Sequence, residues 1–366
     1  MSDSTENRKA DHIRIPLEKD VGAKFATTGF EDTFLVHNSL PELDRGKIQL
    51  ATKAFGHDFS APILAGAMTG GTRKAETING AIAEAVEKLG LGMGVGSQRA
   101  ALENPKLEST YKIVREKAPT SFVIANIGAP QLAKGYGLEE AEKAVSMIEA
   151  DALAIHLNPL QEAIQLEGET RFKGVLLKIE EIAEKLAIPL IVKETGAGIS
   201  AEVAEKLEEV GVKGIDVSGA GGISWAAVEF YRAKNAQDSF HQQLGEDFWD
   251  WGIPTAASLV EASQSSKLTL IASGGIANGI DAAKALALGA SLASMSTPLL
   301  LPATKSSREV KKTLAFIIEE LRNTMFLTGS ETVDALKKTP AVLLGKTAAW
   351  LRQRGFNPEA YARRKK

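Results

Sequence analysis

The chain contains no cysteine in its 366 residues. This absence excludes disulfide frameworks, thiolate zinc sites, iron–sulfur clusters and cysteine nucleophiles, and it agrees with a reducing compartment. A strong charge of one sign is also missing, because 43 Lys and Arg nearly balance 46 Asp and Glu. Without such a charge we expect no nucleic-acid partner and no electrostatic binding to an anionic membrane.

Long apolar runs are absent as well. No uninterrupted run approaches the ~18 residues that a membrane helix needs. Residues 1–12 are polar and lack the apolar core of a secretory signal. We therefore expect a cytoplasmic protein with no membrane partner. Hydrophobic residues still make up 44% of the chain, which is enough for a large core and excludes general disorder.

Eight short apolar runs alternate with amphipathic segments along the chain. Each run is continuously apolar and ends in Gly, Asn, Ser or Thr, a pattern typical of parallel strands covered on both faces. Gly90, Gly211 and Gly289 follow three of the amphipathic segments, where a left-handed helix cap is expected. The runs begin near residues 61, 91, 121, 151, 188, 214, 268 and 291, and helices are expected at 75–89, 139–149, 172–187, 201–210 and 280–288.

About eight strand–helix units predict an α/β fold, specifically a (β/α)8 TIM barrel. An open doubly wound sheet is the alternative, but no G-x-G-x-x-G motif opens a helix after the first strand. We predict one barrel domain over residues 1–366. Residues 1–60 form an N-terminal extension that closes the bottom of the barrel or reaches over its top. Residues 223–254 form an insertion after the sixth strand, expected over the carboxyl-terminal face as a lid or at an interface.

Polar residues cluster at nearly all the predicted strand ends, where a barrel builds its active site. The strand bodies stay apolar, so packing does not explain the cluster. The polar ends lie at 68–71, 97–99, 126, 156–158, 193–195, 218–219, 273–275 and 296–297.

A glycine-rich segment at 272–290 predicts a phosphate site. Its glycines let the backbone approach a phosphate, and the next helix offers amides and a dipole. Ser296 and Thr297 after the eighth strand complete the usual barrel arrangement. The alternative is a tight turn that needs glycine, and the ligand itself is not specified.

Lys193 has three interpretations. It could face a phosphate or the N1–C2 edge of a flavin, act as a Schiff-base lysine, or pair with a neighbouring carboxylate. Glu162 has two: a Mg²⁺ ligand beside a substrate phosphate, or an acidic residue that stabilises a helix N-terminus. Arg8 and Lys9, with Arg99, could bind a diphosphate, or the N-terminal pair could simply be solvated.

Taken together, these segments resemble the type 2, flavin-dependent isopentenyl-diphosphate isomerases. The glycine-rich pieces occur in other FMN barrels, whereas RKxxH, SQR and HLNxxQE are particular to this family. The matching segments run through nearly the whole chain: RKxxH at 8–12, AMTGG at 67–71, GSQR at 96–99, NIG at 126–128, HLNxxQE at 156–162, KExGxGIS at 193–200, VSGAGG at 217–222 and SGGI at 273–276.

The resemblance implies an FMN enzyme that interconverts isopentenyl and dimethylallyl diphosphate with Mg²⁺, with NADPH needed only to reduce the flavin. It implies that FMN contacts Ala67, Met68, Thr69, Ser97, Asn126, Lys193, Ser218, Ile223, Gly274, Gly275, Ile276, Ala277, Ser296 and Thr297. It implies that substrate contacts Arg8, Lys9, His12, Ser97, Gln98, Arg99, His156, Asn158 and Gln161, and that Glu162 ligates Mg²⁺. Family members form homo-oligomers, often tetramers or octamers.

Two positions depart from the family pattern. Ile223 stands where a threonine is usual, which puts one hydroxyl contact to the flavin phosphate in doubt. Ser296 and Thr297 stand where Ala-Gly is more common, so this loop is expected to be slightly repacked.

The chemistry explains the need for a flavin. Protonating an alkene creates a tertiary cation, which a reduced anionic flavin can stabilise without trapping it. We therefore expect reduced FMN to be the principal acid and base, with the catalytic Gln161 positioning the alkene or assisting proton removal. The Mg²⁺-bound diphosphate supplies binding energy for orientation.

Two other functions fit part of the pattern. An FMN-linked 2-hydroxy-acid oxidase needs a catalytic histidine near the last strands, and the only histidine after His156 is His241, within the insertion. A non-enzymatic flavoprotein does not explain the polar strand ends.

Overall fold

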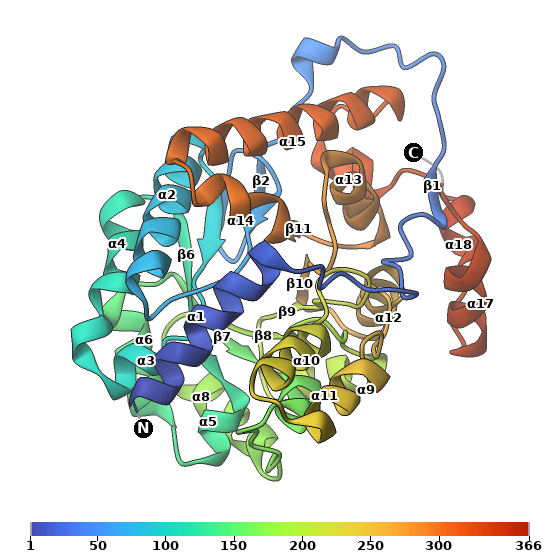
Figure 1. Ribbon diagram of the computed structural model, residues 1–366. Helices are drawn as coiled ribbons and strands as arrows, with labels where there is room; N and C mark the ends of the chain where they lie inside the picture. The colour runs from blue at the N-terminus through green and yellow to red at the C-terminus, as the bar shows by residue number, and fades with distance from the viewer. Residues whose placement is uncertain (1, 365–366) are drawn as a thin grey trace.

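The computed structural model describes residues 2–364, with side chains from residue 8 onward. Eight parallel strands close into a barrel in the order β10-β11-β4-β5-β6-β7-β8-β9 (Figure 1). Each predicted apolar run forms one barrel strand, so the prediction of a TIM barrel is confirmed. The strands are β4 (Ile63–Ala65), β5 (Gly92–Gly94), β6 (Phe122–Gly128), β7 (Ala152–His156), β8 (Leu190–Lys193), β9 (Gly214–Asp216), β10 (Thr269–Ala272) and β11 (Leu292–Met295).

Helices follow the strands around the barrel. The first half contains α2 (Arg73–Leu89), α3 (Arg99–Glu103), α4 (Ser109–Lys117), α5 (Ala129–Ala133), α6 (Leu138–Met147), α7 (Pro159–Ile164), α8 (Val175–Lys185) and α9 (Ala201–Glu209). The second half contains α10 (Trp225–Asn235), α11 (Ser239–Asp247), α12 (Thr255–Ser265), α13 (Gly279–Leu288), α14 (Thr297–Ala303) and α15 (Ser307–Leu327). Beyond the barrel lie α16 (Val333–Lys337), α17 (Gly345–Gln353) and α18 (Glu359–Ala362), and two short 3-10 turns cover Arg45–Lys47 and Pro105–Leu107.

Helix α2 illustrates how the sequence sets these bounds. The Thr72 hydroxyl caps its start by accepting a hydrogen bond from the Ala75 amide at 3.1 Å. Gly90 ends it in the left-handed region, with φ of 62°. The predicted caps at Gly211 and Gly289 also have positive φ, 85° and 123°, but Gly289 lies outside the left-handed helical region.

The N-terminal extension closes the bottom of the barrel. Strands β2 (Thr52–Ala54) and β3 (His57–Phe59) form a hairpin. Phe55 at its turn stacks on Phe122, with ring centroids 5.8 Å apart, and Phe59 packs edge-on against the same ring at 5.4 Å. These rings join the apolar cluster that fills the barrel interior, which leaves room for ligands only at the opposite end.

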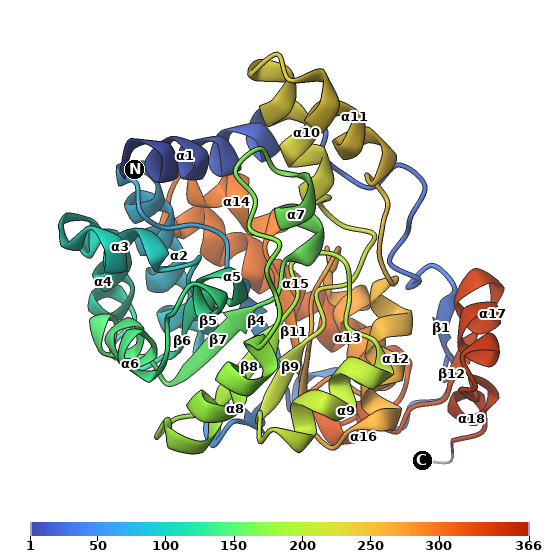
Figure 2. The same cartoon turned by 90° about the horizontal axis from the view of Figure 1, so that it is seen from below.

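The extension also reaches over the top. Helix α1 (Ser2–Glu18) crosses the barrel mouth and contacts α3 and α10, and Figure 2 places α1, α7, α10 and α11 at the same end of the barrel. Helices α10 and α11 are the insertion predicted after the sixth barrel strand, β9. On the flank of the barrel, β1 (Thr33–Leu35) pairs antiparallel with β12 (Ala341–Leu343). Among the described residues, no helix combines the length and apolar character of a membrane span.

Candidate active site

A cavity of about 850 Å³ opens at the carboxyl ends of the barrel strands. Every residue predicted to bind substrate, FMN or metal lines it, with the exception of Gln98. The barrel strand ends supply most of the wall, α1 supplies Arg8, Lys9 and His12, and the start of the insertion supplies Ile223. The fold thus brings together residues that are more than 250 positions apart in the chain.

Gln98 is the one predicted site residue that does not line the cavity. Its side chain is fully buried, and its Nε2 donates to the carbonyl oxygen of Ala144 at 2.8 Å. Its Oε1 accepts from the Asn126 amide at 2.9 Å. Because both ends of the amide bind backbone, Gln98 fixes the loop after β5 against β6 and α6.

His156 and Asn126 form an ordered pair at the ends of β7 and β6. Nδ2 of Asn126 donates to the Val95 carbonyl at 3.0 Å, which leaves Oδ1 to accept from Nδ1 of His156 at 2.8 Å. Burial and the nearby charge of Lys193 lower the pKa of His156 to about 3. The ring is therefore neutral near pH 7, with its proton on Nδ1, and Nε2 is available as an acceptor.

Lys193 ends β8 beside two buried carboxyl groups. Its Nζ donates to the Glu194 carbonyl oxygen and lies 4.0 Å from Oδ2 of Asp216 on β9. Burial raises the pKa of Asp216, against the charge of Lys193. Burial also raises the pKa of Glu194 to about 7, although three backbone amides at 195–197 donate to it.

The glycine-rich loop after β10 packs closely against the loop after β9 and lines the cavity. Gly274 and Gly275 have φ of 98° and 74°, which side chains rarely adopt. A Cβ on Gly222 would lie 2.5 Å from the Gly275 nitrogen, so the loops after β9 and β10 meet backbone to backbone. The Asn278 side chain caps α13 by accepting from the Asp281 amide at 2.8 Å. This arrangement fits a phosphate near a helix N-terminus.

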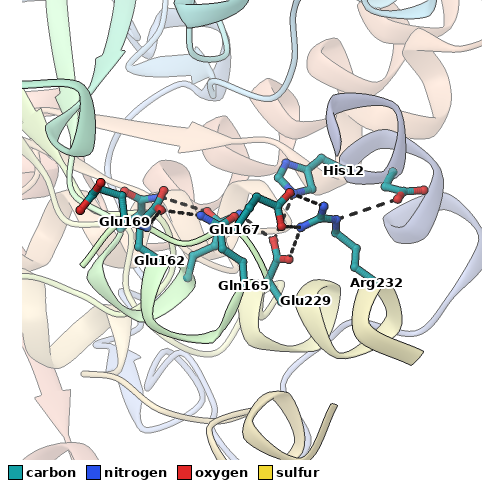
Figure 3. A network of polar contacts seen from close by, with 10 residues as sticks. His12, Glu162, Gln165, Glu167, Glu169, Glu229 and Arg232 are labelled. Atoms are coloured by element: carbon teal, nitrogen blue, oxygen red, sulfur yellow. Dashed lines mark hydrogen bonds and ion pairs between the residues drawn. The ribbon is translucent and has the colours of Figure 1, made fainter. Parts of the chain in front are cut away.

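Gln161 belongs to a network that the sequence did not reveal. Its Nε2 donates to Oε1 of Glu229 on α10 at 3.0 Å, and Nε2 of His12 lies 3.1 Å from the same oxygen. Arg232 donates to the other Glu229 oxygen at 2.6 Å and to Glu167 at 2.6 Å (Figure 3). The network therefore joins α1, α7, α10 and the loop after α7.

Glu229 is the buried centre of this network, with only 1% of its side chain exposed. Burial resists its ionisation, but the hydrogen bond from His12, the charge of Arg232 and the hydrogen bond from Gln161 together lower the pKa of Glu229. Burial lowers the pKa of His12, although its contact with Glu229 opposes this shift. The sequence offers no signal for Glu229, because it lies among ordinary amphipathic positions of the insertion.

Glu162 lines the cavity and its carboxylate is held by three neighbours. Its carboxylate accepts hydrogen bonds from Nδ2 of Asn158 at 3.0 Å, from the Glu169 amide at 2.7 Å and from Gln165. Oδ1 of Asn158 is buried beside it and has no hydrogen-bond partner in the described part of the chain. Within that part, no group of three or more His, Cys, Asp or Glu side chains could hold a metal. A Mg²⁺ ion here would need oxygens from water or a bound phosphate, which is its usual preference.

Comparison with known proteins places the chain in a family. It is 49% identical to an isopentenyl-diphosphate delta-isomerase of Methanothermobacter thermautotrophicus over 98% of this chain and 99% of that one. It is 48% identical to the enzyme of the same name from Methanosarcina barkeri, over 99% of this chain and 98% of that one. It is 49% identical to the enzyme from Pyrococcus furiosus, over 95% of this chain and 89% of that one.

A family model described as FMN-dependent dehydrogenase matches residues 162–342. Among solved structures, a flavocytochrome b2 with sulfite bound has a TM-score of 0.65 at 19% identity, covering 93% of this chain and 83% of that one. A mandelate oxidase variant has a TM-score of 0.62 at 15% identity, covering 93% of this chain and 98% of that one. These two likenesses establish the barrel fold alone. On the identity to its full-length relatives, the chain belongs to the type 2, FMN-dependent isopentenyl-diphosphate delta-isomerase family.

Proposed function

We propose that this protein interconverts isopentenyl and dimethylallyl diphosphate, using FMN and Mg²⁺. The observation that carries the proposal is the single cavity that contains both the glycine-rich phosphate loop at 273–277 and the basic residues Arg8, Lys9 and Arg99. The phosphate loop and the basic residues are two regions that suit anions. They would accommodate two ligands, a flavin phosphate and a substrate diphosphate. Gln161 lines the same cavity.

The flavin region fits FMN in shape and chemistry. The loop glycines allow the segments after β9 and β10 to pack closely at the cavity wall, and Lys193 lies at the strand ends where the isoalloxazine ring is expected. Reduced FMN, when bound, supplies the acid and base that move the proton. Ile223 offers no hydroxyl to the phosphate, so backbone groups must replace that contact.

The substrate region assigns a task to each side chain. Arg8, Lys9 and Arg99 neutralise the diphosphate. Glu162, with Oδ1 of Asn158, would hold Mg²⁺, which would add positive charge for the diphosphate and help to orient the substrate. Gln161 faces the alkene, and Glu229 orients its amide by accepting from Nε2. The neutral His156 adds no charge that would repel a carbocation.

The oxidase alternative lacks its base. His241 lies on α11, where Nδ1 contacts Oδ2 of Asp238 at 2.8 Å, and it does not line the cavity. His156 is neutral but lies on β7, away from the last strands.

The test is incubation of isopentenyl diphosphate with protein, FMN, Mg²⁺ and NADPH, followed by detection of the dimethylallyl isomer. We expect turnover that requires reductant and FMN. Full turnover by the apoprotein, or with oxidised FMN alone, would contradict the role of the flavin. Oxidation of 2-hydroxy acids instead of isomerisation would support the alternative.

The remaining expectations belong to the same proposal. We propose that the whole chain works as one cytoplasmic FMN-binding domain and that NADPH serves only as reductant. We also propose homo-oligomers, tetramers or octamers, because Phe240 and Trp251 of the insertion expose 68% and 63% of their surface.

A further inference from the structure

We propose that Tyr111 is a positioning residue that holds the ammonium of Lys9 toward the substrate diphosphate. This inference rests on the proposed function, because it takes Lys9 as a diphosphate-binding residue. Tyr111 itself does not line the cavity and lies fully buried on α4. It therefore acts through Lys9, which does line the cavity.

Three polar atoms form a closed triangle. Nζ of Lys9 donates to the Ser97 carbonyl oxygen at 2.7 Å and to the Tyr111 hydroxyl at 3.2 Å. The Tyr111 hydroxyl donates to the same Ser97 oxygen at 2.6 Å. Two of the three ammonium protons thus point at fixed partners, which leaves the third for a ligand. Tyr111 and Ser97 together determine where that third proton points.

The ring of Tyr111 occupies a space that the sequence reserves for it. A Cβ on Gly70 would lie 2.1 Å from the Tyr111 ring, and a Cβ on Gly71 would lie 3.0 Å from Cδ of Lys9. The Gly71 amide donates to Oγ1 of Thr110 at 2.9 Å, which ties the loop after β4 to α4. The glycine pair of the AMTGG segment therefore makes room for the tyrosine ring and the lysine stem.

The electrostatics make the hydroxyl matter for charge as well as position. Burial, together with nearby positive charges, lowers the pKa of Lys9 to about 7. Burial raises the pKa of Tyr111 well above its usual range, so its hydroxyl stays protonated and contributes a dipole, not a charge. Four charged or titratable groups face Lys9. Arg8 and Arg99 lower its pKa and Glu103 raises it. The fourth group, His156, is neutral.

The sign of the effect follows from this balance. The Tyr111 oxygen accepts a hydrogen bond from the ammonium form of Lys9, so removing it lowers the pKa of Lys9 further. Above that pKa the free protein holds a neutral amine and must take up a proton to bind a diphosphate. The affinity for diphosphate therefore decreases as the pH rises. In a variant without the Tyr111 hydroxyl, this decrease begins at a lower pH.

The experiment compares Tyr111→Phe with Tyr361→Phe in the FMN-loaded protein. Tyr361 is a buried tyrosine on α18 whose hydroxyl contacts Ser263 and the Leu288 carbonyl, away from Lys9. We expect Tyr111→Phe to raise the KM for isopentenyl diphosphate about tenfold with kcat changed less than about twofold. Its loss of affinity with rising pH should begin at lower pH. Tyr361→Phe should leave KM, kcat and the pH profile unchanged.

The Lys9→Met background tests whether Tyr111 acts through Lys9. There, Tyr111→Phe should raise KM no further. An equal rise in both backgrounds, a loss in kcat alone, or no change in KM would overturn the proposal. Flavin absorbance and thermal unfolding establish that each variant is folded. If Tyr111→Phe does not fold, Gly70→Ala is used in its place, because its added Cβ would lie 2.1 Å from the Tyr111 ring and must displace it. A rise in KM that disappears in the Lys9→Met background supports the proposal, and an equal rise in both backgrounds overturns it.

Calorimetric titration with magnesium diphosphate separates this inference from the proposed function. The Kd should rise about tenfold in Tyr111→Phe, whether or not the protein isomerises the alkene. A wild type that binds diphosphate without isomerising isopentenyl diphosphate contradicts the proposed function and leaves Tyr111 in its role. Equal Kd values for the wild type and Tyr111→Phe contradict the role of Tyr111.

Discussion

Single side chains at the cavity are held by neighbours before any ligand arrives. Gln161 is fixed by Glu229, and His156 by Asn126. Glu162 takes three hydrogen bonds yet stands beside the unpaired Oδ1 of Asn158. A site whose side chains are already oriented loses less conformational entropy when it binds substrate.

Glu162→Gln tests the metal assignment at this scale. The amide keeps the size of the side chain but removes the charge that binds Mg²⁺. We expect kcat/KM to fall about 100-fold or more and the Mg²⁺ concentration for half-maximal rate to rise. Initial rates over a Mg²⁺ titration measure both effects.

The matched control is Glu139→Gln. The Glu139 side chain pairs with Lys143 on the exposed face of α6, outside the cavity lining, so its neutralisation should leave the Mg²⁺ dependence unchanged. Glu162→Gln kinetics that match this control would remove Glu162 from the metal site.

Residues at strand ends can be predicted from sequence, because parallel strands in a barrel place their carboxyl ends at one rim. Gln98 shows the limit of this rule: its position at the rim is right, but its side chain binds the backbone. Glu229 and Tyr111 lie on helices and reach the site only through tertiary packing. Asp216 lies inside an apolar strand run, where one polar residue gives no sign of which group it will face.

At the scale of elements, the loops after β9 and β10 work as one unit. A Cβ on Gly274 would lie 2.2 Å from the Gly219 carbonyl oxygen, and one on Gly275 would lie 2.4 Å from Cγ2 of Thr28. Thr28 belongs to the N-terminal extension, so three distant segments meet at the phosphate loop. The sequence predicts each loop but not their contact, because contact depends on the closed barrel.

Gly275→Ala should weaken flavin binding. The new methyl group must displace Thr28 or the loop itself, and φ of 74° strains any residue with a side chain. We expect the Kd for FMN to rise about tenfold or more. Quenching of flavin fluorescence during titration of the apoprotein measures this Kd.

Gly135→Ala controls for backbone strain alone. Gly135 has φ of 109°, and its added Cβ would meet nothing within 4 Å. This variant should lose some stability but bind FMN as the wild type does. If both variants bind FMN equally well, the loop does not depend on the close approach at Gly275.

The N-terminal extension shows what the sequence leaves open at this scale. Its composition allows a position at the bottom of the barrel or over the top, and the structure contains both. The β2–β3 hairpin fills the bottom because Phe55 and Phe59 need an apolar partner, which Phe122 supplies. Helix α1 crosses the top, where His12 meets Glu229.

For the whole molecule, stability and chemistry are located at opposite ends of the barrel. Phe59→Ala removes a side chain that is 1% exposed from the bottom cluster. We expect the free energy of unfolding to fall by about 3–5 kcal/mol. The kcat of folded, FMN-loaded protein should change less than about twofold, because no cavity residue is touched.

Denaturant unfolding and initial rates on the same preparation provide the two readouts. Phe316→Ala is the control, since that ring is 66% exposed on α15 and its loss should change stability by less than about 0.5 kcal/mol. A large fall in kcat for folded Phe59→Ala would mean that the bottom cluster transmits strain to the cavity.

The contacts of Arg232 and Glu229 have a consequence for affinity. They connect α1 to the insertion and to the loop after α7, while α1 also supplies Arg8 and Lys9 to the cavity. A diphosphate can contact Arg8 and Lys9 only in protein molecules whose α1 is packed, or seated, on the barrel. Its apparent affinity is therefore the intrinsic affinity multiplied by the seated fraction. Weakening these contacts is therefore expected to raise the KM for the diphosphate by lowering the seated fraction of α1.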